Sequence, residues 1–133
     1  MRRWPLVYSA LAGACDTLTG VLLVVAPATT LHLMGLTSIP TEAVWLRWIG
    51  AFVGAVGLTY LYPFALPAAG RRSRLAVVLE ATALIRLVVA TFVGVALLRG
   101  WLETGWISVL ATDLVLALAQ LAILRRGALD EAL

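Results

Sequence analysis

The sequence of 133 residues has no lysine, one cysteine and one histidine. The single cysteine, Cys15, excludes an internal disulfide and a metal cluster held by cysteines alone. Zinc or haem ligation by His32 would need further ligands, and none stands at a suitable spacing, so neither a metal site nor a cofactor is predicted. The ten basic residues are all arginines and do not form one patch, which argues against a nucleic-acid partner despite the net charge of +3.

Charge of either sign is scarce, at 13% of the chain, whereas hydrophobic residues make up 62%. A soluble domain is usually about 45–50% apolar and about 25% charged. A chain of this length could not hide so much apolar surface from water, because small domains expose a large share of their area. The composition therefore predicts an integral membrane protein, with the lipid bilayer as its first partner.

Four long apolar runs account for most of the chain, and each is long enough for a helix that crosses a hydrocarbon core about 30 Å thick. The runs are apolar on every face, whereas the strands of a membrane barrel alternate polar and apolar residues over about 10 positions. The predicted fold class is therefore all-α: a single transmembrane domain over residues 1–133, built as a four-helix bundle. Prolines, glycines and capping residues at the ends place the spans at about 5–26, 43–66, 74–98 and 104–124.

Two connections on one side of this bundle differ in length. Residues 27–43 are long enough for a short helix or an extended segment along the membrane surface, whereas residues 99–104 form a tight turn. At the N-terminus, Arg2 and Arg3 followed by an apolar run up to Cys15 look somewhat like a signal peptide with a lipid-attachment site. Because Ala12 stands where such sites usually have leucine, an uncleaved first helix is expected.

The arginines are divided unevenly between the two ends of the predicted bundle. Only Arg47 and Arg99 belong to one end. The other end holds a larger set: Arg2, Arg3, Arg71, Arg72, Arg74, Arg125 and Arg126. Positive residues are retained on the cytoplasmic side, so both termini are expected in the cytoplasm and the chain in a bacterial cytoplasmic (inner) membrane.

Three of the four spans carry an ionisable residue near their middle: Asp16, Arg86 and Asp113. At about 1.5 Å per residue, each lies roughly 16–18 Å from the cytoplasmic end of its span. An isolated charge at that depth costs about 2.5–3.5 kcal/mol or more. Opposite charges at one depth should pair, and the planar guanidinium can serve two carboxylates. We therefore predict an Asp–Arg–Asp cluster in the bundle interior, which is either a structural clasp or a ligand or proton site.

A second polar layer is predicted nearer the cytoplasm, formed by Tyr8, Tyr60, Glu80 and Gln120. Glu80 precedes Arg86 by six residues, so the two side chains lie about 120° apart around a helix. We therefore expect Glu80 to meet Tyr60 or Gln120, or to extend toward the arginines at the start of its span.

A stripe of small residues runs along the second span: Gly50, Gly54 and Gly57. Small residues four apart let helices approach closely in lipid. The stripe predicts a helix-packing face, which either contacts another helix of the same chain or faces a partner chain.

Several short motifs carry a family resemblance. The first span contains Asp16-Thr-Leu-Thr-Gly20 ahead of Pro27, and the second contains Arg47-Trp-Ile-Gly50 followed by Gly54, Gly57 and Tyr60. With a basic residue in the third span and an acid in the fourth, the chain resembles the DoxX-like small four-helix bacterial membrane proteins and their uncharacterised relatives. The resemblance covers nearly the whole chain. Some such proteins are similar to membrane subunits of quinone-linked oxidoreductases, but no redox-partner motif stands in this sequence, so that role is carried over to no residue.

Three functions remain open at this point. The first is a non-catalytic accessory or stabilising subunit of a larger membrane complex, with a membrane protein or a second copy of the chain as partner. The second is a membrane-embedded binding protein or enzyme that acts on a quinone, lipid or other small amphiphile through the midplane cluster. The third is a proton or small-solute carrier, although the inverted repeats typical of carriers are not visible. No catalytic residue is predicted, and the chain is not expected to be an enzyme.

Overall fold

The computed structural model describes residues 3–130 of the chain. Within them the structure is all-helical and contains no strand. The elements in chain order are α1 (Trp4–Val25), α2 (Pro27–Leu33), α3 (Ala43–Ala65), α4 (Arg71–Leu98), the 3-10 turn η1 (Thr104–Trp106) and α5 (Ile107–Arg125).

Four of these segments are long and apolar enough to cross a membrane: α1, α3, α4, and η1 together with α5. The prediction of an all-α class is thereby confirmed, and the four helices have the length and composition that a multi-pass membrane protein requires. The third span begins at Arg71, three residues before its predicted start, because Gly70 adopts a left-handed conformation (φ 73°) and the helix can begin directly after it. Arg2, a member of the arginine set above, lies outside the described residues.

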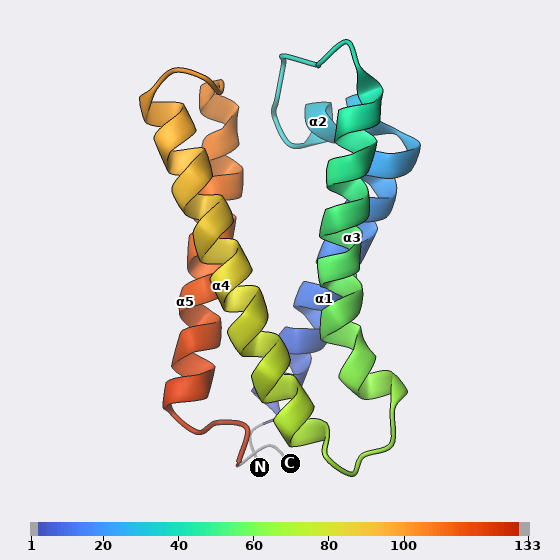
Figure 1. Cartoon of the computed structure of the whole chain (residues 1–133), viewed down its shortest axis with the longest axis vertical. Helices are drawn as coiled ribbons and strands as arrows, with labels where there is room; N and C mark the ends of the chain where they lie inside the picture. The colour runs from blue at the N-terminus through green and yellow to red at the C-terminus, as the bar shows by residue number, and fades with distance from the viewer. Residues whose placement is uncertain (1–2, 131–133) are drawn as a thin grey trace.

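The long helices pack as two antiparallel pairs rather than as four equivalent neighbours (Figure 1). Most contacts between helices lie within the pair α1 and α3 or within the pair α4 and α5. The ribbons of the two pairs approach each other at the end of the molecule near the two termini, and they diverge toward the end that carries α2 (Figure 1). The predicted four-helix bundle is therefore built from two closely packed helix pairs.

Each end of the molecule has its own cluster of buried apolar side chains. At the end near the termini, residues from all four long helices and from the segment after α5 pack into one core: Ala12, Tyr60, Leu75, Val78, Leu79, Ile123, Ala128 and Leu129. At the opposite end, Leu31 of α2 and Leu36 pack against Leu23 of α1 and Leu46 of α3, with Trp106 at the edge. The first cluster joins the two helix pairs, whereas the second lies mostly on the α1/α3 pair.

The loop after α2 is also tied to the α4/α5 pair by a single carboxylate. Glu103 accepts hydrogen bonds from the Thr37 hydroxyl (2.7 Å) and from the backbone N–H groups of Thr37 (2.9 Å) and Ser38 (3.0 Å). These hydrogen bonds, the Thr37 hydroxyl first, lower the pKa of the Glu103 carboxyl because they favour its charged form. The predicted long connection is thus a short helix followed by a tethered extended segment.

Candidate functional site

The three midplane residues predicted from the sequence lie together in the structure. Arg86 of α4 donates from Nη1 to Asp113 Oδ1 on α5 (2.6 Å) and from Nη2 to Asp16 Oδ2 on α1 (2.5 Å). Its Nε donates to the Tyr60 hydroxyl on α3 (3.2 Å). One guanidinium therefore uses all three of its nitrogens and links all four long helices.

Arg86 is deeply buried, but its two carboxylates are not fully enclosed. The Arg86 side chain is 7% exposed, whereas Asp16 is 16% and Asp113 is 14% exposed. Each carboxylate engages Arg86 through only one of its oxygens. If both acids are ionised, the cluster carries one net negative charge. The cluster can therefore still accept a proton or a cationic group, because each carboxylate keeps one oxygen outside its ion pair with Arg86.

The predicted second layer continues from this cluster through Tyr60. The buried Tyr60 hydroxyl also accepts a hydrogen bond from Gln120 Nε2 on α5. Gln120 Nε2 donates as well to the Thr82 hydroxyl on α4 (2.7 Å), and that hydroxyl donates to the Val78 carbonyl (2.6 Å). The layer thus joins α3, α4 and α5 next to the Arg86 guanidinium.

Thr82 is a member of this network that the sequence reasoning missed. It lies four residues before Arg86, and residues four apart share one face of a helix. That spacing was the available signal. It was weak because a threonine in a helix usually satisfies its hydroxyl on a carbonyl one turn earlier, as Thr59 and Thr91 do here.

The other two members of the predicted layer have different positions. Tyr8 is partly buried and donates to the Leu116 carbonyl of α5 (3.1 Å), so it ties α1 to α5 but makes no side-chain hydrogen bond with Gln120. Glu80 is exposed on the outer side of α4 and makes no hydrogen bond or ion pair within residues 3–130. Neither predicted arrangement is observed, because Glu80 makes no hydrogen bond with Tyr60 or Gln120 and no ion pair with the arginines at the start of its span. The inward face of α4 is set by Leu79, Thr82 and Arg86, and Glu80 is turned well away from it.

The glycine stripe of α3 lies against α1 of the same chain. A Cβ atom at Gly50 or Gly57 would lie under 3.0 Å from atoms of α1, and one at Gly20 of α1 would lie equally close to the backbone of α3. At Gly54 the nearest atom would be 3.7 Å away, which is ordinary contact. All three glycines therefore belong to an interface within the chain, and only at Gly54 would an added Cβ find room.

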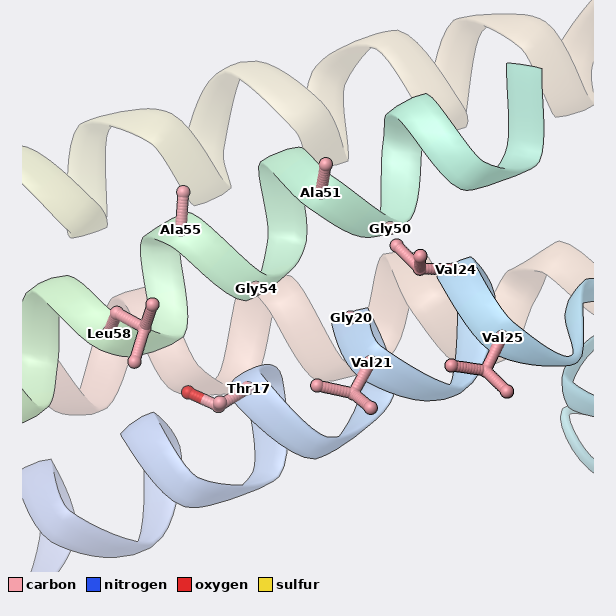
Figure 2. A pocket seen from close by; sticks show the side chains of 10 residues that line it. All are labelled: Thr17, Gly20, Val21, Val24, Val25, Gly50, Ala51, Gly54, Ala55 and Leu58. Carbon is pink, nitrogen blue, oxygen red and sulfur yellow. The ribbon is translucent and has the colours of Figure 1, made fainter. Parts of the chain in front are cut away.

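A shallow groove follows the outer side of this crossing. Figure 2 shows Gly20 of α1 beside Gly50 and Gly54 of α3, with valines of α1 and small residues of α3 along the rims. The groove has a volume of about 290 Å³, and it is lined by Thr17, Gly20, Val21, Val24, Val25, Gly50, Ala51, Gly54, Ala55 and Leu58. Because Val21, Val25 and Leu58 are exposed, it opens to the outside of the molecule and not toward Arg86.

The described residues contain no group of three or more His, Cys, Asp or Glu side chains arranged to hold a metal ion. No protein-family model, no curated protein and no solved structure matches this chain.

Proposed function

We propose that this protein is a non-catalytic accessory or stabilising subunit of a larger complex in a bacterial cytoplasmic membrane, with both termini in the cytoplasm. The observation that carries the proposal is the use of Arg86. The strongest polar group within the spans donates to three side chains of its own chain. It therefore acts as a clasp between the two helix pairs, beside the apolar core that joins them at the end near the termini.

The outer surface supports the same proposal. Large apolar side chains stand exposed along every long helix, including Leu18 on α1, Phe52 on α3, Val88 on α4 and Val115 on α5. In lipid, such faces can pack against other membrane helices through van der Waals contact. The cytoplasmic placement of the termini rests on the arginine distribution, and the DoxX-like relationship rests on the motifs given above; both are part of the proposal.

Co-purification tests the accessory role. The tagged protein is extracted from its native membrane in a mild detergent, and the eluate is quantified by mass spectrometry. We expect a membrane protein in near-stoichiometric amount. A monodisperse protein that carries a bound amphiphile and no partner protein would contradict the proposal.

The clasp is tested by aspartate variants. Asp16→Asn or Asp113→Asn alone leaves Arg86 one charged partner. The free energy of unfolding, measured by thermal unfolding in detergent, should therefore change by about 1 kcal/mol or less. The double variant leaves a buried guanidinium without a counter-charge and should cost about 3–5 kcal/mol. Single variants that abolish function at unchanged stability would show that the cluster is more than a clasp.

A second candidate is a membrane-embedded binding protein for a small amphiphile. The partial exposure of Asp16 and Asp113, each with one oxygen outside the ion pair, favours a ligand with a cationic or hydrogen-bond-donating end. Organic extraction of the purified protein, followed by mass spectrometry, tests this candidate. A stoichiometric amphiphile that is lost in Asp16→Asn would support it.

A further inference from the structure

A second groove lies where α3 ends and α4 begins. It has a volume of about 270 Å³ and is lined by Tyr62 of α3 and by Ser73, Arg74, Val77 and Val78 of α4. Its walls are almost entirely apolar, and the side chains of Arg74 and Tyr62 are among the residues that form them. The Asp16–Arg86–Asp113 cluster uses none of these residues.

Three arginines stand at this turn, and only one has a carboxylate partner within residues 3–130. Arg72 pairs with Asp130. Arg71 instead donates to the Pro63 carbonyl (3.2 Å) and the Leu66 carbonyl (3.4 Å), and Arg74 donates from Nη1 to the Pro67 carbonyl (3.3 Å). Carbonyl oxygens at the end of α3 thus hold two guanidinium groups in place without neutralising their charge.

Along α4, the charged residue of the groove, Arg74, precedes its two valines. Val77 follows Arg74 by three residues, about 4.5 Å along the helix axis, and is 64% exposed. Tyr62, 54% exposed, stands beside it on α3. Glu80 lies exposed about one further turn along α4. An anionic group is therefore attracted near Arg74 and repelled farther along, whereas an acyl chain fits beside the valines.

We propose that this groove binds one anionic phospholipid. The phosphate lies against the Arg74 guanidinium and the Tyr62 hydroxyl, and an acyl chain runs along Val77 and Val78. Basic groups between membrane helices near the headgroup level recognise anionic lipid heads, and each such residue favours an anionic over a neutral lipid by about fivefold. Arg74 pairs with no carboxylate within residues 3–130, so its charge favours an anionic headgroup over a choline headgroup. The inference is independent of the proposed accessory role, because any span-forming chain meets phospholipid.

Native mass spectrometry of the full chain in detergent tests the site. Dioleoyl phosphatidylglycerol and dioleoyl phosphatidylcholine are titrated separately, and glycerol 3-phosphate is added as a soluble competitor. We expect one phosphatidylglycerol retained per chain, about five- to tenfold more strongly than phosphatidylcholine, with no competition by glycerol 3-phosphate at equal concentration. Equal retention of the two lipids, or full displacement by glycerol 3-phosphate, would overturn the proposal.

Variants separate this groove from general charge attraction. Arg74→Gln should reduce phosphatidylglycerol retention about fivefold, whereas Arg99→Gln, at the opposite end of α4, should leave it unchanged. Val77→Trp keeps every charge but fills the apolar wall, and it should also release the lipid. If Arg99→Gln weakens retention as much as Arg74→Gln, or if Val77→Trp has no effect, the lipid is held by diffuse charge and the groove is not its site.

Discussion

The helices α1 and α3 meet backbone to backbone, whereas the two helix pairs meet through side chains, in an apolar core and in a buried charge cluster. In the first interface Gly20 approaches Gly50 and Gly54, and Thr17 lies against Gly57. In the second, Arg86 extends from α4 to Asp16 on α1 and to Tyr60 on α3. Lipid supplies little hydrophobic force between helices, so close packing of small residues and polar contacts are the two means available. This chain uses each of them in a separate place.

The two interfaces should respond differently to substitution. A glycine contact has no tolerance for added atoms but carries no charge, so its failure is steric and local. A buried charge cluster tolerates small changes of shape but not the loss of charge balance.

Arg86→Leu should have the largest effect. It leaves two carboxylates partly buried without a counter-charge and removes the one side chain that reaches all four long helices, so the free energy of unfolding should fall by about 3–5 kcal/mol. Folded yield and thermal unfolding in detergent measure it. Recovery of yield in the triple variant with Asp16→Asn and Asp113→Asn would identify charge imbalance as the cause. If Arg86→Leu alone changed neither yield nor thermal unfolding, the cluster would not stabilise the fold.

Gly57→Ala tests the other interface, with Gly54→Ala as the matched control on the same helix. A methyl group at Gly57 collides with Thr17, so the cost should be about 1–3 kcal/mol. At Gly54 the same methyl group finds ordinary contact, and the better helix propensity of alanine should make the change neutral or stabilising by up to about 1 kcal/mol. Similar unfolding temperatures for the two variants would show that α1 and α3 are not in close backbone contact.

Gln120→Leu and Glu80→Gln compare an inward with an outward polar residue. Gln120→Leu removes hydrogen bonds to Tyr60 and Thr82, but it also removes a buried carbonyl oxygen that has no partner, so the net cost should be about 1 kcal/mol. Glu80→Gln should change stability by less than about 0.5 kcal/mol, because its side chain is exposed. Thermal unfolding of both variants shows which of them loses more stability. A larger loss for Glu80→Gln would mean that the Glu80 carboxylate makes a stabilising contact.

The smallest effect concerns the Glu103 tether and its dependence on pH. The pKa of this carboxyl is lowered in the folded state, so the tether is fully present above the ordinary carboxyl pKa and is lost as the pH falls through the lowered value. Fluorescence of Trp106, which lies three residues away, should report this loss in acid. Glu103→Gln should show no such transition, and an identical acid transition in that variant would assign it to another group.

Much of the fold follows from distances along single helices. The spans near 5–26, 43–66, 74–98 and 104–124 were predictable because a membrane-crossing helix needs a known number of apolar residues. The common depth of Asp16, Arg86 and Asp113 was predictable for the same reason, since depth is the count of residues multiplied by the rise. Exclusion of an isolated charge from hydrocarbon then made their pairing the expected arrangement.

Which helices pack against each other, and through which faces, could not be predicted in this way. The sequence did not show that α1 pairs with α3 more closely than with α5, nor that Glu80 stands outside the network while Thr82 lies within it. These outcomes depend on which faces of helices far apart in sequence meet. Runs that are apolar on every face leave that choice to contacts between individual atoms.

Four membrane spans with three ionisable residues at one depth could be predicted from the sequence, because length, hydropathy and helix rise act within one segment at a time. Three features became known only from the structure: one guanidinium joins all four long helices, α1 covers the glycines of α3, and a groove that includes Arg74 lies at the turn between α3 and α4. Each of these depends on the rotation and spacing of neighbouring helices, which are set by packing between segments.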